Sequence, residues 1–419
     1  MFTPERFLTA SLSSHPRGGL VTRIIASAFQ SVHAGDAVRK FLKMNPLPTA
    51  KRSYAFGLGK AACAMTSALA DFVQPTDSLI ITKHASSLDL EPVTVIEGDH
   101  PVPGDSSLAA GRAALDFVSR LTPDDLLVCL ISGGGSALMT APIIPLSELQ
   151  EITSALLANG ARIDEINTLR RHLDLLKGGG LAQAANGARI VSLILSDVVG
   201  DPLEAIASGP TAPDPTTVTD AKRVAKLVDV HNNFRETLKP GDPIFDSVQN
   251  HIIGSNDIAL HAAKEQAEAQ GFDTEILYSG LQGEAREVGE MLARELKKQS
   301  EKRARPFCLL AGGEMTVTLK GDGTGGRNQE LALGAVDVLR DVQDVMLISI
   351  ATDGEDGPTD AAGAVVTGAS AQRAERLGLD AAGYLSRNDA YTYFAELDDL
   401  LKPGPSGTNV NDLVFCFAF

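Results

Sequence analysis

The sequence lacks several features that would place it in a class at once. No segment approaches the roughly 18 uninterrupted apolar residues that a membrane helix needs, so we expect no transmembrane span. The opening residues include Glu5 and no sustained apolar stretch, which is not the form of a secretory signal. Four cysteines stand singly in apolar surroundings, at Cys63, Cys129, Cys308 and Cys416. Without pairs at metal-binding spacing they indicate reduced core thiols, and we expect a cytoplasmic protein.

Basic residues are also in deficit. The chain carries 37 Lys and Arg against 53 Asp and Glu, a net charge of -16, and it has no basic block. Such a charge repels another extended polyanion, which argues against nucleic acid as a partner. The P-loop pattern G-x-x-x-x-G-K-[ST] is absent, so a phosphate site has to be built in another way.

Short apolar runs alternate with helical stretches along the chain. Runs such as "YAFGLG", "SLIITK", "LLVCLISGGG" and "RIVSLILSD" each precede an amphipathic or alanine-rich segment, which is typical of βαβ units. Because 419 residues exceed what one core usually supports, we expect two α/β domains. We predict a Rossmann-like domain with a parallel sheet at residues 1–245, and a smaller α/β domain with a mixed sheet at 246–419 on which residues 1–45 can pack. "EMTVTLKGDG" directly behind "CLLAGG" predicts an antiparallel hairpin in the second domain.

The turn after the first strand has the form of a dinucleotide fingerprint. In "GLGKAA", Gly57, Gly59 and Ala62 complete G-x-G-x-x-A before a helical pattern. A dinucleotide site also needs an acidic residue after the second strand, but "SLIITK" ends in Lys83, which leaves an NADP reductase or a plain tight turn open. Lys60 inside the turn favours an anion, because N–H groups, helix dipole and ammonium would converge on one phosphate or carboxylate. The competing interpretation is a solvated surface lysine.

A second glycine loop follows the most apolar strand of the chain. In an open α/β sheet, ligands bind beyond the carboxyl ends of the strands. The glycines of "ISGGGSA" allow several backbone N–H groups to face a ligand oxygen, and its serines add hydroxyl groups. The candidate phosphate-binding residues of this loop are Ser132, Gly133, Gly134, Gly135 and Ser136.

Carboxylates and one arginine follow other strands. Asp197, Glu314 and Asp353 stand where a carboxylate can bind Mg²⁺ or accept a hydroxyl proton, although each alone is compatible with a helix cap or a turn. In "GDGTGGRNQE", Arg327 and Asn328 follow a glycine loop, and the planar guanidinium suits a carboxylate or a phosphate. The alternative for Arg327 is a surface arginine beside a hairpin turn.

Taken together, these blocks resemble a known family. The glycerate 2-kinase family that ends in a MOFRL domain is matched, in order from about residue 50 to 412, by "GLGKAA", "GDHPVPGD", "LISGGGSALM", "NTLRRHLDLLKGGGLA", "LILSDVVGDPLEAIASGPT", "GGEMTVTLKGDGTGGRNQELAL" and "ATDGEDGPTDAAGAVV". The resemblance implies ATP-dependent phosphorylation of D-glycerate at its 2-hydroxyl, with a divalent metal, in a cleft between two domains. It also implies catalytic roles for Lys60 and Arg327.

The residue inventory suits that chemistry. Phosphoryl transfer requires positioning and compensation of negative charge, which glycine turns, two cations and a metal supply. We expect Asp197 to accept the proton of the hydroxyl, and Asp197, Glu314 or Asp353 to bind Mg²⁺. Some relatives carry the name hydroxypyruvate reductase, so an NAD(P)H-dependent reductase is the alternative, and a non-catalytic protein that binds sugar acids or phosphate is a third. The expected partners are glycerate and ATP, for a monomer or a homodimer.

Overall fold

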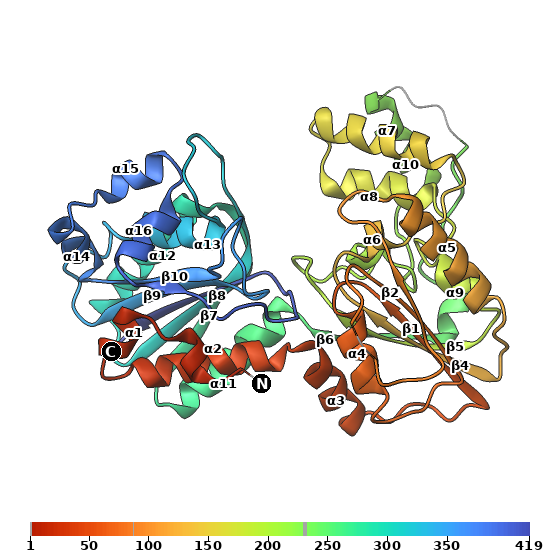
Figure 1. Cartoon of the computed structure of the whole chain (residues 1–419), viewed down its shortest axis with the longest axis horizontal. Helices are drawn as coiled ribbons and strands as arrows, with labels where there is room; N and C mark the ends of the chain where they lie inside the picture. Colours follow the sequence, from red (N-terminus) through yellow and green to blue (C-terminus); the bar gives the residue numbers. More distant parts are fainter. Residues whose placement is uncertain (1, 87, 229–232) are drawn as a thin grey trace. The chain divides into compact units, whose positions relative to one another are not determined.

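The structure is a computed structural model that describes residues 2–86, 88–228 and 233–419. It contains two compact units (Figure 1). Ala34–Ile253 form the first, called here the parallel-sheet unit. Met1–His33 and Gly254–Phe419 together form the second, called the mixed-sheet unit.

Six strands in the order β3-β2-β1-β4-β5-β6 form the core of the parallel-sheet unit. Their bounds are β1 (Arg52–Leu58), β2 (Asp77–Thr82), β3 (Thr94–Glu97), β4 (Asp125–Ile131), β5 (Arg189–Leu195) and β6 (Val248–Gly254). The pairs β1–β2, β1–β4, β2–β3 and β4–β5 are parallel. Parallel neighbours need crossover connections, which the helical stretches between the apolar runs provide. The predicted Rossmann-like parallel sheet is confirmed.

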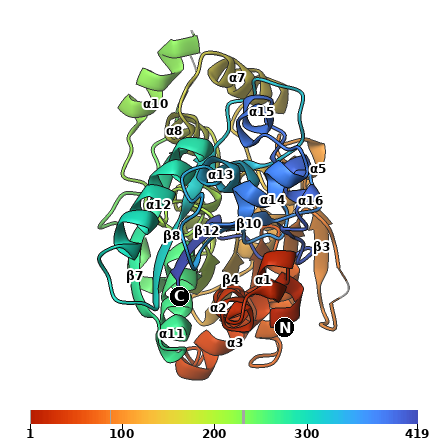
Figure 2. The ribbon, with the colours of Figure 1, turned by 90° about the vertical axis from the view of Figure 1, so that its left-hand side faces the viewer.

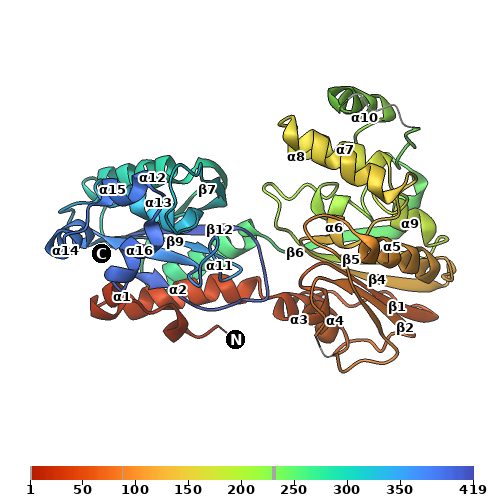
Figure 3. The same cartoon turned by 45° about the horizontal axis from the view of Figure 1, so that its top comes forward.

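Helices cover both faces of this sheet (Figure 3). Residues of α3 (Ala34–Met44) and α4 (Ala62–Leu69) belong to the apolar cluster on one face, and those of α5 (Asp105–Val118) and α9 (Gly180–Ala184) to the cluster on the other. Alternate residues of β4 belong to the two clusters, for example Val128 to one and Cys129 to the other. Because neither face meets water, "DLLVCLI" is apolar throughout and does not alternate with polar residues.

Three further helices of this unit pack mainly on one another. They are α7 (Leu146–Ala158), α8 (Ile163–His172) and α10 (Val218–Ala225), and they bury a cluster that includes Leu156, Leu169 and Val224. The short helix α6 (Gly135–Leu138) begins in the second glycine loop. Single 3-10 turns lie at Pro4–Phe7, Ile206–Ser208, Lys226–Val228 and Pro243–Ser247.

The mixed-sheet unit contains a second six-stranded sheet, in the order β11-β10-β9-β12-β8-β7. The strands are β7 (Asp273–Glu284), β8 (Phe307–Thr316), β9 (Val345–Ala351), β10 (Gly363–Thr367), β11 (Leu400–Leu401) and β12 (Asp412–Ala418). Only β7 and β8 pair in parallel, whereas β12 is antiparallel to both β8 and β9, so the predicted mixed sheet is confirmed. The predicted hairpin is wrong, because "CLLAGGEMT" lies within the single strand β8 and its antiparallel partner is β12.

Helices from distant parts of the sequence cover this second sheet (Figure 2). One face packs against α1 (Ala10–Ser14), α2 (Gly18–Ser31) and α11 (Asn256–Ala269). The other packs against α12 (Ala285–Ser300), α13 (Arg327–Ala335), α14 (Ser370–Arg376), α15 (Ala381–Ser386) and α16 (Ala390–Glu396). No helix in the described ranges is long and apolar enough to cross a membrane.

The observed units differ from the predicted domain limits of 1–245 and 246–419. Residues 1–33 belong with the C-terminal half, because Phe7, Ile25 and Phe29 are buried in the same cluster as strand residues such as Phe415. At the other limit, residues 246–253 stay with the first unit, because β6 completes its sheet. The parallel-sheet unit is therefore one continuous segment inserted into the mixed-sheet unit.

Candidate functional site

The first glycine turn is held against the second by backbone contacts. Lys60 N–H donates to Gly133 O at 3.0 Å, and Ala61 N–H donates to Ser132 Oγ at 3.0 Å. Gly59 has φ of +119°, and a Cβ built there would lie 2.4 Å from Ser132 O. Only glycine allows this approach. Ser132 is buried and helps to hold the turn, and its predicted contact with a phosphate stays a prediction.

Lys60 extends over the second glycine loop. A Cβ built on Gly134, which has φ of +85°, would lie 3.4 Å from both Lys60 Cε and His100 Nε2. Burial lowers the pKa of His100, and the positive charges of Lys60 and Lys83 lower it further. The surroundings of this loop are therefore electropositive although the chain as a whole is acidic.

Asp197 approaches the same loop from the end of β5. A Cβ built on Gly133 would lie 1.9 Å from Asp197 Oδ2, so the carboxylate occupies space that any other residue at position 133 would fill. Lys60 and Asp197 therefore both lie against one glycine loop. We call this arrangement the glycine-loop site; its members are Gly57, Gly59, Lys60, Ser132, Gly133, Gly134, Gly135, Ser136 and Asp197.

A strained turn supports the start of α6. Ser136 Oγ lies 2.8 Å from Oγ of Ser208, which is fully buried. Ala207, Ser208 and Gly209 have φ of 50°, 60° and 61°, all in the left-handed region. Left-handed φ at consecutive non-glycine residues costs free energy, and such turns cluster at functional sites. Ser208 stands in the block "LILSDVVGDPLEAIASGPT" quoted above, but it was not among the candidate site residues.

Two basic residues near this site were also missed. Lys177 is buried, and its ammonium donates to Met139 O at 2.8 Å and to Asp174 Oδ2 at 3.0 Å, which fixes the chain just after α6. Burial lowers the pKa of Arg170. Burial also lowers the pKa of Lys177, where Asp174 opposes the effect and the charge of Arg170 adds to it. Within the described ranges no carboxylate forms an ion pair with Arg170. Both residues stand in "NTLRRHLDLLKGGG", a block quoted above only for the family resemblance.

The second group of predicted residues lies in the mixed-sheet unit, where Arg327 begins α13. Its Nη2 donates to Asp412 Oδ1 at 3.2 Å, and its Nε lies 2.7 Å from Asp412 Oδ2. On the other side, its Nη1 donates to Glu314 Oε1 at 3.0 Å. Burial disfavours the charged guanidinium, but the two carboxylates outweigh that effect and raise the pKa of Arg327. Arg327 is thus a fixed cation within a side-chain network.

Buried polar groups support this arginine. Asn328 Nδ2 donates to Asp412 Oδ1 at 2.8 Å and to Asp356 Oδ1 at 3.3 Å, while its own Oδ1 accepts from Ser349 Oγ at 2.7 Å. Asp356 also accepts from the backbone N–H groups of Asn328 and Gln329, so it caps the start of α13. Because Asn328 is fully buried and engaged, the structure places it as a link inside the network. We call this set, Glu314, Arg327, Asn328, Asp356 and Asp412, the arginine cluster.

Burial shifts the pKa of two of the three acids of the cluster. It raises the pKa of Asp356 to about 6, against the N–H groups that favour the charged form. It raises the pKa of Asp412 to about 7, with the nearby Asp356 adding to the rise and Arg327 opposing it. These two carboxylates were not predicted as site residues.

The predicted metal ligands are not gathered in one place within either unit. Glu314 pairs with Arg327, and Asp353 lies after β9, where its Oδ1 accepts from Glu355 N–H at 3.2 Å. Asp197 belongs to the other unit. Among the residues that the structure describes, no group of three or more His, Cys, Asp or Glu side chains could hold a metal.

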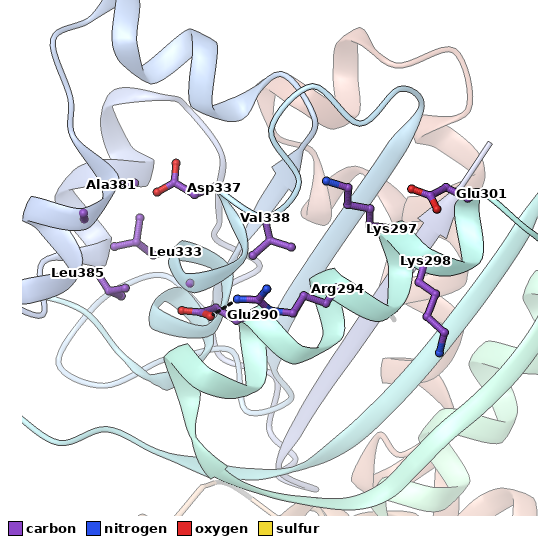
Figure 4. Close-up of a pocket in the computed structure, with 12 residues that line it drawn as sticks. Glu290, Arg294, Lys297, Lys298, Glu301, Leu333, Asp337, Val338, Ala381 and Leu385 are labelled. Atoms are coloured by element: carbon purple, nitrogen blue, oxygen red, sulfur yellow. Dashed lines mark hydrogen bonds and ion pairs between the residues drawn. The ribbon is translucent and has the colours of Figure 1, made fainter.

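The mixed-sheet unit also has a groove of about 650 Å³ (Figure 4). It is lined by α12, α13 and α15, and none of the predicted site residues lines it. Arg294 in its wall donates to Glu290 Oε2 at 2.9 Å, one helical turn away (Figure 4). Its charged side chains have the spacing of a solvated helix surface.

Comparison with known proteins adds a separate line of evidence. A family model described as a domain of unknown function (DUF4147) matches residues 20–240, and the MOFRL family model matches residues 307–412. A D-glycerate 2-kinase of Thermotoga maritima is 38% identical, over 94% of this chain and 97% of that protein. A protein of Agrobacterium vitis named putative hydroxypyruvate reductase is 39% identical over 89% of each. A crystal structure of a Thermotoga maritima glycerate kinase superposes with a TM-score of 0.90 at 37% identity, over 96% of this chain and 99% of that one.

Proposed function

This chain belongs to the glycerate kinase family with a C-terminal MOFRL domain, and on that premise we propose that it transfers the γ-phosphoryl group of ATP to the 2-hydroxyl of D-glycerate. The substrate oxygen forms a bond to the γ-phosphorus, and the bond from that phosphorus to the β–γ bridging oxygen breaks. The products are 2-phosphoglycerate and ADP. The observation that supports this proposal most is the glycine-loop site, where a lysine and a carboxylate lie on one loop.

The glycine-loop site has the groups that phosphoryl transfer uses. The backbone N–H groups of a glycine loop can face phosphate oxygens, and Lys60 adds a positive charge beside Gly134. Asp197 lies against Gly133 and is the proposed acceptor of the 2-hydroxyl proton. We assign phosphate contacts to the glycines and Lys60, and proton transfer to Asp197.

Arg327 is the proposed second cation. Fixed charges that need not reorganise during the reaction stabilise a transition state most effectively. Asp412 holds the guanidinium at two nitrogens, so its orientation is set in advance. Because Asp412 contacts Nε and Nη2, we propose that the carboxylate of glycerate pairs with Nη1 of Arg327.

Mg²⁺ is the proposed metal of the reaction. It usually binds through one or two carboxylates together with substrate phosphates. Binding of this kind needs only one or two carboxylates. It is therefore compatible with the described residues, which contain no group of three possible ligands. Asp197 in the parallel-sheet unit and Asp353 in the mixed-sheet unit are each a proposed single ligand, and Glu314 is available as one only after its pair with Arg327 separates. The ion would neutralise charge on the phosphates.

Reduction of hydroxypyruvate is the second candidate, because of the name of the Agrobacterium vitis relative. A dinucleotide clamp needs an acidic residue after the second strand of the fold. Here β2 ends at Thr82 and is followed by Lys83 and His84. This departure from the fingerprint favours the kinase.

One coupled assay separates the candidates. Purified protein with ATP, Mg²⁺ and D-glycerate is expected to yield phosphoenolpyruvate when enolase alone is added. A requirement for phosphoglycerate mutase as well would indicate attack at the 3-hydroxyl. Steady oxidation of NADH or NADPH with hydroxypyruvate would support the reductase, and binding of glycerate without turnover would support a non-catalytic role. We propose that the enzyme acts in the cytoplasm.

A further inference from the structure

The two carboxylates that pair with Arg327 differ in burial. The side chain of Asp412 is 0% exposed, whereas that of Glu314 is 46% exposed. Asp412 contacts two guanidinium nitrogens and also accepts from Asn328, but Glu314 contacts only Nη1. One carboxylate is part of the interior, and the other lies at the edge of the cluster.

This difference in burial decides which carboxylate can separate from Arg327. Separating Asp412 from Arg327 would leave an unpaired charge in the interior, which is strongly unfavourable. Glu314 can exchange Arg327 for water, and exposed pairs of this kind contribute little to stability. Within the described residues, Arg327 is the only partner of the Glu314 carboxylate. An incoming anion can therefore reach Arg327 by displacing Glu314.

We propose that Glu314 occupies the position of the substrate carboxylate on Arg327 and is displaced when glycerate binds. The proposal rests on the kinase function proposed above only in naming glycerate as the acid. The exchange replaces one carboxylate by another on Nη1, so the charge beside the guanidinium is conserved. A phosphate group would instead bring additional negative charge next to the buried Asp412.

Glu314 then acts as a specificity-determining residue. A neutral polyol such as glycerol has no anion that can displace the glutamate, so it competes poorly for Arg327. An acid substrate restores the ion pair that it breaks. Asp412 stays paired with Arg327 throughout, and Nη1 faces a carboxylate both before and after the exchange.

The test compares Glu314→Gln with the wild type. Without its charge the side chain competes less for Arg327, so we expect the KM for glycerate to fall about two- to fivefold, the range given by an exposed ion pair. The KM for ATP should change less than that for glycerate. Glu290→Gln is the matched control, because Glu290 is 45% exposed, pairs with Arg294 at 2.9 Å and lies outside the arginine cluster. It should leave both values unchanged.

Direct binding measurements test the displacement of Glu314 independently of kinase activity. Calorimetry without nucleotide measures the Kd of D-glycerate, inorganic phosphate and glycerol for each variant. Tighter glycerate binding by Glu314→Gln supports displacement even if the wild type shows no turnover, which would refute only the kinase. An unchanged glycerate Kd, tightening for phosphate alone, or an equal gain in Glu290→Gln would overturn the displacement. Glu314→Ala provides a second variant without an amide, and it should tighten glycerate binding as well.

Discussion

The two proposed cations are positioned in different ways. Lys60 is exposed and stands on a turn fixed by backbone contacts and glycines. Arg327 is held by the buried carboxylate of Asp412, which Asn328 also contacts. The first arrangement depends on the absence of side chains, and the second on their presence. The difference teaches that added volume should disrupt the glycine-loop site, whereas altered charge or hydrogen bonding should disrupt the arginine cluster.

The largest effect is expected at Lys60. Lys60→Met removes the charge and keeps most of the side-chain volume, so we expect kcat to fall about 100- to 1,000-fold, as for loss of one transition-state contact. Steady-state assays with ATP and glycerate measure the change. Lys43→Met, at an exposed lysine in α3 of the same unit, is the control and should retain full activity. Comparable turnover by Lys60→Met and the wild type would contradict the assigned role.

Gly133→Ala tests whether the glycine-loop site depends on the absence of a side chain at position 133. Its Cβ would lie 1.9 Å from Asp197 Oδ2, so the carboxylate has to move. A displacement of this size in a reacting group lowers kcat by about 100-fold. The control is Gly19→Ala, where an added Cβ would have no neighbour closer than 3.9 Å. If Gly133→Ala kept wild-type kcat, Asp197 would not be the proton acceptor in this position.

Arg327→Lys keeps the positive charge and tests whether the hydrogen bonds of the guanidinium are needed. One ammonium cannot reproduce the guanidinium contacts with Asp412 and a substrate at the same time, so we expect kcat/KM to fall about 10- to 100-fold. Arg340→Lys alters an exposed arginine that pairs with Asp337 and Glu375 in the same unit, and it should have little effect. Full activity of Arg327→Lys would show that charge alone suffices, as proposed for the glycine-loop site.

The smallest effect concerns pH. Burial raises the pKa of Asp412 to about 7, and only its ionised form holds Arg327 fully. We therefore expect kcat/KM to rise a few-fold between about pH 6 and pH 8. The contribution of Asp412 to the free energy of unfolding changes with pH in the opposite direction. Because the folded pKa lies above the unfolded one, folding takes up a proton, and this stabilisation is present below about pH 4 and lost towards pH 7.

Comparison of Asp412→Asn with the wild type tests whether Asp412 causes the pH effect. The variant should have lower kcat/KM and lack this part of the pH dependence, both in kinetics and in the free energy of unfolding measured with urea. Asp356, with a pKa raised to about 6, remains titratable in the variant and accounts for a residual slope. An identical pH–rate profile in the two proteins would exclude Asp412 as its source.

Local patterns predicted most of the fold. Apolar runs bounded by glycine gave the parallel strands, because strands buried on both faces are apolar throughout. Packing of residues 1–45 on the second domain was expected as a possibility, but the limit at residue 33 depends on contacts with a cluster formed hundreds of positions later, which no local pattern encodes. The predicted hairpin failed for the same reason, since the antiparallel partner of β8 comes from the distant strand β12.

The candidate site divides in the same way. Lys60, Gly133 and Asp197 could be selected because each follows an apolar run, and parallel strands bring such ends to one edge. Asp412 is 85 positions from Arg327 and begins an apolar strand, so only the antiparallel pairing of β12 explains its contact. Its role could not be predicted before that pairing was known.

The insertion of one unit into the other has a consequence for biosynthesis. Residues 34–253 are continuous, so they can complete their own sheet while the ribosome is still translating. The helices α1 and α2 emerge earlier, but the strands that cover Phe7 and Phe29 are made after residue 254. The apolar side chains of this first segment can therefore be buried in that cluster only after the last strands have been made.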